Sequence, residues 1–262
     1  MPRRLALRAV ALGYLVVILL APLVTVCYRT FQHGLEPVWQ ALSDPDTVHA
    51  FRVTLIATAI AVPLNTVFGV LCALAIVRRR FRGKGLLNAF IDLPLAVSPV
   101  VIGLCFYLLY ENTGWFGSRL SQHGFHILFA MPAIVLVTIF VSVPFVAREV
   151  IPTLRELGNE QEQAAATLGA TRWQRFWRIT LPSIRWAVIY GVVLTTARCL
   201  GEYGAVAVVS GRIEGSTETA TLRVDTYLQN FDDTGAYAVS LVLAAIAVFV
   251  LVAMTAIRPR EG

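Results

Sequence analysis

The residues of this chain best placed to do chemistry are Arg198 and Glu202, two charged side chains within an otherwise apolar segment. Their spacing of four would put both on one face of a helix. A charge inside a membrane is costly and usually faces the interior of a helix bundle or a water-filled path. Two interpretations stay open. The two side chains form an ion pair that neutralises itself, or this face, with Tyr203, lines a pore through the bundle. The small neighbours Gly201 and Gly204 would let helices approach closely.

Other residue types suggest no catalytic or metal site. His123 and His126 are three positions apart, but no third metal ligand stands near them. The four cysteines are far apart and have no metal-ligand spacing, so they read as small buried hydrophobes. The sequence has no GxxxxGK[ST] motif to cradle ATP. We therefore expect no catalytic residue, no metal site and no directly bound cofactor, and we do not expect an enzyme.

The composition indicates what must position the charged pair. Hydrophobic residues make up 57% of the 262 residues, charged residues 15%, and the mean hydropathy is +0.69. Soluble domains are nearer 45–50% apolar and about a quarter charged. This excludes a soluble enzyme, a secreted disulfide scaffold and a disordered protein. The net charge is +6. The basic residues that produce it lie in clusters between apolar stretches, which indicates a lipid bilayer and not nucleic acid as the partner.

Six stretches are long and apolar enough to cross a membrane as helices. Their apolar runs are continuous rather than alternating, which favours helices over strands. We expect a single all-α transmembrane domain over residues 1–262, with the first stretch retained as an uncleaved anchor. The predicted spans are 5–28, 51–77, 86–110, 128–147, 186–209 and 236–257.

The basic residues predict the orientation of these spans. If the N-terminus is cytoplasmic, 16 Arg and Lys residues fall in inside segments and five in outside segments. That excess predicts that both termini are cytoplasmic. The cluster at 78–84 is explained by orientation and anionic headgroups.

Prolines interrupt several spans, including Pro94 and Pro99 in the third. Membrane helices tolerate such bends. They are either packing irregularities or part of a translocation path, in which case Ser98 and Pro99 are candidates to line it. Asp92, just before Pro94, is expected to cap a broken helix or to pair with the basic cluster at 78–84. The charged segment 211–235 is expected to meet a partner protein or to form an outer gate.

The polar segment 148–185 is the longest cytoplasmic connection in this topology. Asn159 is a good N-cap residue for a short alanine-rich helix, and Gly169 can end that helix in the left-handed conformation. Thr171 can then cap a second helix, which carries Trp173 and Trp177. The first helix is either a plain surface helix or one that lies in the groove of a partner.

The residues from Gln163 to Gly169, followed after nine residues by Ile179-Thr-Leu-Pro182, resemble the E-A-A-x3-G-x9-I-x-L-P loop of bacterial ABC-importer permeases. Gln163 stands where the family usually has Glu, and Glu162 lies about 100° round the helix from it. The resemblance implies a type I (MetI-like) permease fold, alternating access, and ATP bound by a separate subunit. The residues that it assigns to ATPase coupling are Glu162, Gln163, Ala164, Ala165, Leu168, Gly169, Ala170, Ile179, Leu181 and Pro182.

Residues 81–101 and 197–205 are similar to the sulfate and molybdate permeases, and 208–222 look most like the W-type subunit of sulfate/thiosulfate importers. The chain departs from that pattern at Glu214 and at Ala220-Thr221. The resemblance implies an inner-membrane sulfate or thiosulfate permease. It also implies a T-type permease partner, two ATP-binding subunits and a periplasmic sulfate-binding protein. The alternatives are a molybdate or tungstate permease and an ATP-independent channel or secondary transporter.

Overall fold

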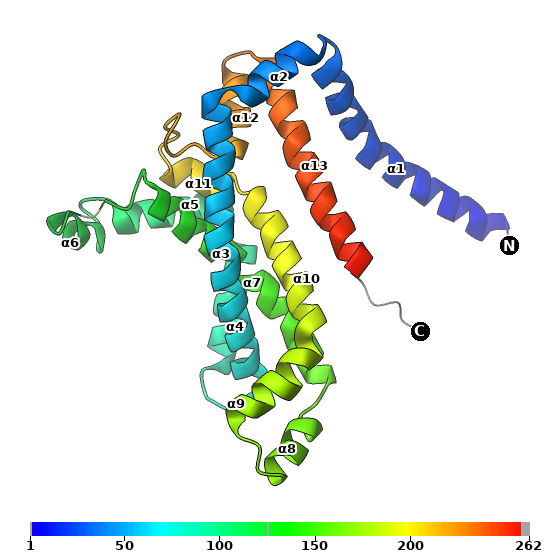
Figure 1. Ribbon diagram of the computed structural model, residues 1–262, viewed down its shortest axis with the longest axis vertical. Helices are drawn as coiled ribbons and strands as arrows, with labels where there is room; N and C mark the ends of the chain where they lie inside the picture. Colours follow the sequence, from blue (N-terminus) through cyan, green and yellow to red (C-terminus); the bar gives the residue numbers. More distant parts are fainter. Residues whose placement is uncertain (1, 125, 258–262) are drawn as a thin grey trace.

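The computed structural model describes residues 2–124 and 126–257, and over these residues it is built from helices joined by short connections (Figure 1). One five-residue stretch, η1, is a π-helix and joins α9 to α10. The elements are α1 (Pro2–Phe31), α2 (Leu35–Ser43), α3 (Pro45–Arg78), α4 (Lys84–Ala96), α5 (Pro99–Tyr110), α6 (Gly117–Gln122), α7 (Met131–Glu156), α8 (Glu160–Thr167), α9 (Arg172–Arg175), η1 (Phe176–Thr180), α10 (Leu181–Leu200), α11 (Gly204–Val209), α12 (Ala220–Gln229) and α13 (Asp233–Ile257).

The expected all-α membrane fold is confirmed. Among the described residues, four helices are long and apolar enough to cross a membrane: Pro45–Arg78, Met131–Glu156, Arg172–Leu200 and Asp233–Val250. Two bent pairs raise that number to as many as six, namely Val16–Phe31 with Leu35–Ser43 and Lys84–Ala96 with Pro99–Tyr110. Arg258 and Arg260, which contribute to the predicted orientation, lie outside the described residues.

The third predicted span, 86–110, is not a continuous helix. It is divided into α4 and α5, which meet at 110°. Val97 and Ser98 are extended, with ψ of 138° and 135°. Pro99 accounts for this, because its ring disfavours the helical conformation in the residue before it, while the proline itself suits the first turn of a new helix.

The fifth predicted span, 186–209, is also interrupted. α10 begins earlier than expected, at Leu181, and ends at Leu200, and the chain becomes helical again only at Gly204. Glu202 lies in the break. Its carboxylate Oε1 accepts a hydrogen bond of 3.0 Å from the backbone N–H of Ala205, and its backbone carbonyl accepts one of 2.6 Å from the Thr221 hydroxyl. The expectation that Arg198 and Glu202 share one helix was therefore wrong, because Glu202 caps the next one.

The core of the bundle is formed where α3, α7 and α10 cross with almost no space between them. A Cβ added at Gly69 of α3 would lie 2.7 Å from Cβ of Val146, and one added at Gly191 of α10 would lie 2.7 Å from Cα of Val146. Val146 on α7 is fully buried between these two glycines. Nearby, the amide of Asn65 donates to the Ile139 carbonyl and to the Ser142 hydroxyl. Small residues thus set the close approach of these membrane helices.

Asp92 joins the half-helix α4 to this core. Its two carboxylate oxygens accept hydrogen bonds from Arg148 on α7, one from Nε at 2.6 Å and the other from Nη2. Pairing with the basic cluster at 78–84 was the wrong expectation. Bidentate pairing of this kind fixes orientation as well as distance, so α4 is held against α7.

Different short helices lie at the two ends of the bundle (Figure 1). α8 and α9 project from one end, whereas α2, α11 and α12 lie toward the other. α1 leans away from the bundle beside α13. Many large apolar side chains on the outer faces of α3, α4 and α5 are exposed, among them Leu64, Val67, Phe90 and Leu104. Such an outer surface suits lipid or partner helices rather than water.

Candidate functional site

The projecting loop has the two-helix form predicted from its sequence. Gly169 ends the alanine-rich segment with φ of +83°. Thr171 caps α9: its hydroxyl accepts from the backbone N–H of Gln174, and the Gln174 side chain accepts from the backbone N–H of Thr171. Asn159 occupies the predicted N-cap position of α8, although its side chain makes no capping hydrogen bond with the described residues.

Glu162 joins this loop to the membrane core. Its Oε1 accepts from Nε and Nη2 of Arg78, at 3.2 and 3.1 Å, and from the Thr180 hydroxyl at 3.0 Å. Arg78 also donates to the Leu154 carbonyl at the end of α7, at 3.2 Å. One carboxylate therefore connects α8 with α3 and η1, and through Arg78 with α7. The side chains of Arg78 and Glu162 are only 18% and 20% exposed, so water screens this ion pair less than a surface pair.

The remaining motif residues divide into two groups. Gln163, Ala164, Leu168 and Gly169 are exposed, and Leu168 reaches 88%. Ala165 and Ala170 are half-buried. Ile179 and Leu181 are half-buried too, with Leu181 packed against the buried cluster of α3, α7 and α10, and Pro182 opens α10. The structure thus presents residues 163–169 outward and uses 179–182 mainly to attach the loop.

The two helix breaks lie side by side. A Cβ added at Gly204 would lie 3.2 Å from Cβ of Pro99, and one at Gly103 of α5 would lie 2.7 Å from the Ala205 carbonyl oxygen of α11. The N-termini of α5 and α11 are therefore packed together with their backbones in contact. Discontinuous helices of this kind commonly form the ion and substrate sites of transporters.

The pore candidates gather near these breaks. Nη1 of Arg198 lies 2.6 Å from Oε2 of Glu202, whose side chain is 3% exposed, whereas that of Arg198 is 28% exposed. Tyr203 is 39% exposed, and its hydroxyl accepts a 3.4 Å hydrogen bond from Arg212. Ser98 is exposed next to Pro99. The ion pair exists, and it leaves part of the guanidinium accessible.

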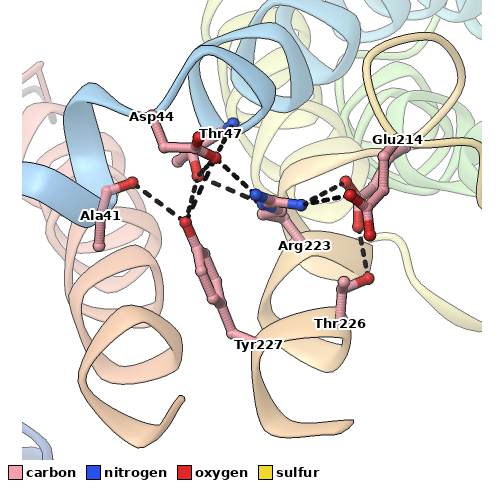
Figure 2. Close-up of polar contacts among 8 residues, drawn as sticks. Ala41, Asp44, Thr47, Glu214, Arg223, Thr226 and Tyr227 are labelled. Atoms are coloured by element: carbon pink, nitrogen blue, oxygen red, sulfur yellow. Dashed lines mark hydrogen bonds and ion pairs between the residues drawn. The ribbon is translucent and has the colours of Figure 1, made fainter. Parts of the chain in front are cut away.

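Sequence reasoning missed a buried charge cluster at the other end of the bundle (Figure 2). Arg223 of α12 is 7% exposed. Its Nη2 lies 2.5 Å from Oδ2 of Asp44, and its Nη1 lies 3.4 Å from Glu218 and 3.5 Å from Glu214. The guanidinium also stacks over the ring of Tyr227 at 4.6 Å. The segment 211–235 was expected only to meet a partner protein or to form an outer gate, and nothing in the sequence paired its Arg223 with Asp44.

Burial and pairing change the acidity of this cluster. Burial raises the pKa of Glu218, and the hydrogen bonds from Thr226 and Arg223 reduce that rise without cancelling it. Burial also acts to raise the pKa of Asp44, but the hydrogen bonds from Arg223 and from the Thr47 backbone outweigh it, so this pKa is lowered. Arg223 thus stabilises the ionised form of Asp44, whereas burial disfavours the ionised form of Glu218.

Together, the helical fold, the adjoining broken helices and the projecting helix–turn–helix loop define the class of membrane permease subunits of ABC importers. The chain belongs to the family described as the binding-protein-dependent transport system inner membrane component, whose model matches residues 65–261. Membership confirms the expectation of a transport subunit that is not an enzyme.

The chain is similar to named sulfate permeases. It is 48% identical to the sulfate transport system permease protein CysW of Synechocystis over 97% of this chain and 92% of that protein. It is 37% identical to the permease CysT of Escherichia coli K12, over 96% and 91%. A bacterial alginate ABC transporter, solved with its alginate-bound periplasmic protein, has the same fold, with a TM-score of 0.81, 19% identity and coverage of 99% and 96%.

Proposed function

We propose that this permease subunit carries sulfate or thiosulfate across the inner membrane by alternating access. The observation that carries the choice of substrate is its 48% identity to a sulfate permease over nearly the whole of both chains. The partly exposed guanidinium of Arg198 beside two broken helices supports an anion as cargo. In this proposal Arg198 offsets the charge of the passing anion, and Glu202 keeps the anion from binding too tightly.

The exposed face of α8 is the proposed contact with an ATP-binding subunit. Leu168 directly follows α8 and is flanked by small residues, and an apolar side chain so exposed suits the groove of a partner. Because Glu162 fastens α8 to three other elements, a movement of that partner would reach the membrane helices directly. Gln163 would take part in this contact as a neutral hydrogen-bonding group. α8 and both termini are then cytoplasmic.

The proposed assembly has two permease chains, two ATP-binding subunits and a periplasmic sulfate-binding protein. The likeness to both a W-type and a T-type sulfate permease supports a pair of different chains. The broken helices and the segment 211–235 would face the binding protein. Co-purification tests the assembly, because two different permease chains would appear in equal amounts, whereas a homodimer would contradict the pairing.

The decisive experiment is uptake of radiolabelled sulfate by the purified complex in proteoliposomes loaded with ATP. We expect uptake that requires hydrolysable ATP and the binding protein, with thiosulfate as an effective competitor. Stronger competition by molybdate than by thiosulfate would overturn the choice of substrate. Uptake that persists with an inactivated ATPase would instead indicate a channel or a secondary transporter.

A further inference from the structure

A cavity of about 580 Å³ lies between the end of α3, the helix α8 and the segment α9–η1. Its lining includes the apolar residues Leu71, Leu74 and Phe176. It also includes arginines, among them Arg79, Arg172 and Arg175. A cavity lined by both apolar and basic side chains fits an amphipathic anion.

The positive charge of this cavity is not neutralised from within. Four arginines and one glutamate line it, and the glutamate, Glu162, is already paired with Arg78. Nε of Arg175 is buried and has no hydrogen-bond partner among the described residues, and its Nη1 makes only a long 3.4 Å contact with the Glu162 carbonyl. A buried donor without a partner costs free energy, so the cavity would be stabilised by an acceptor that carries negative charge.

The cavity lies at the end of a helix that is long and apolar enough to span the membrane. This helix, α3, ends at Arg78, where such a helix would reach the lipid headgroups. Leu71, two turns before that end, is 59% exposed on the outer face of the helix. Trp173 and Trp177 beside the cavity are 69% and 50% exposed. Exposed tryptophans of this kind are enriched at the membrane–water interface.

From these observations we propose that the cavity binds the phosphate headgroup of an anionic phospholipid. Arg172 and Arg175 contact the phosphate oxygens, Arg79 adds to the field, and the first methylene groups of the lipid lie along Leu71, Leu74 and Phe176. Basic pockets between membrane helices suit such headgroups. A bound lipid would bridge α3 and α9 and so brace α8 from a side that Glu162 does not reach. The inference does not depend on which anion the permease transports.

The test uses the full-length chain, purified with the subunits that accompany it, in nanodiscs of phosphatidylcholine with or without phosphatidylglycerol. Native mass spectrometry counts the retained phosphatidylglycerol. The variants are Arg172→Gln and Arg175→Gln. The matched control is Arg178→Gln, an exposed arginine of the same segment that does not line the cavity.

We expect the affinity for phosphatidylglycerol to fall about fivefold for each cavity arginine removed and to stay unchanged in the control. Arg172 is exposed, so Arg172→Gln remains informative even if Arg175→Gln fails to fold. Equal retention of lipid by Arg172→Gln and by the control would overturn the proposal. So would release of the lipid by millimolar inorganic phosphate, which would assign the cavity to a soluble oxyanion.

Absence of retained lipid whenever an ATP-binding subunit is attached would also overturn it, because that subunit would then fill the cavity. Sulfate uptake is measured on the same samples. A sample that binds lipid but transports no sulfate contradicts the proposed function alone, and the reverse result contradicts the lipid site alone.

Discussion

Glu162 of α8 accepts hydrogen bonds from both Nε and Nη2 of Arg78, the last residue of α3, although the two residues are 84 positions apart. Gln163, which occupies the place of the usual glutamate of the coupling motif, points outward instead. The two neighbours therefore have different tasks. Glu162 holds the helix to the membrane domain, whereas Gln163 is exposed and borders the cavity beside α3.

The first prediction concerns this attachment. Glu162→Ala leaves Arg78 without its carboxylate partner, and loss of such a partly buried pair costs roughly 1–3 kcal/mol. We expect about a tenfold loss of sulfate uptake in proteoliposomes, with the complex still assembled. Glu162→Gln should retain the Thr180 bond and lose less. Gln163→Glu is the matched control and should transport at least as well as the wild type. Wild-type uptake by Glu162→Ala would refute the attachment role.

The second prediction concerns the charged pair at the helix break. Arg198→Ala should abolish most uptake in a well-expressed complex, whereas Arg198→Lys, which keeps the charge but not the planar fork, should retain part of it. Arg119→Ala removes an exposed arginine of α6, and its effect should be small. If Arg198→Ala assembles and transports normally, the pair is structural only.

The third prediction concerns the glycine contacts of the core. Gly191→Ala would place a methyl group 2.7 Å from Cα of Val146, a backbone atom that cannot rotate away. Overpacking of this kind costs about 1–3 kcal/mol. We expect a lower unfolding temperature of the purified complex in detergent. Gly85→Ala, where an added Cβ meets nothing within 4 Å, is the control. Equal unfolding temperatures for the two variants would contradict the packing described for α10.

The fourth prediction is a pH dependence from Glu218. Because burial raises its pKa in the fold, the folded protein binds more protons than the unfolded chain as pH rises from the ordinary value of 4.5. Its contribution to stability therefore falls as pH rises through that window. Asp44, whose pKa is lowered, acts in the opposite sense at lower pH.

Glu218→Gln removes the unfavourable ionisation, so its stability relative to the wild type should increase as pH rises from 4.5 and then level off. Unfolding temperatures measured between pH 4.5 and 8 check this. A difference in unfolding temperature between Glu218→Gln and the wild type that stays constant with pH would contradict this prediction.

Structural features that depend on residues close together in the chain could be predicted from the sequence. Gly169 and Thr171 marked a helix end and a helix start, and the structure has both. The bend at Ser98–Pro99 follows the same local rule, yet the apolar run across it favoured a continuous span. Hydropathy reports how apolar a segment is and not whether its axis turns, so the angle between α4 and α5 had to come from tertiary packing.

Contacts between residues far apart in the chain could not be predicted from the sequence. Arg223 and Asp44 are 179 positions apart, and either could have paired with a closer charge. Glu202 was placed on a helix because its spacing from Arg198 fits one, but the N–H of Ala205 offered its carboxylate a second partner. Competition between such partners is decided by the whole fold, which periodicity does not encode.

Val146 is in close contact with both Gly69 and Gly191. Because the three helices touch at this level, we expect α3, α7 and α10 to move together. α8 is pinned to the same group of helices through Glu162. If α8 is pushed by a partner, we expect the movement to reach these helices through Glu162 and Arg78. Bending during a transport cycle is then expected at the helix breaks 97–98 and 201–203, after which Pro99 and Gly204 lie in contact.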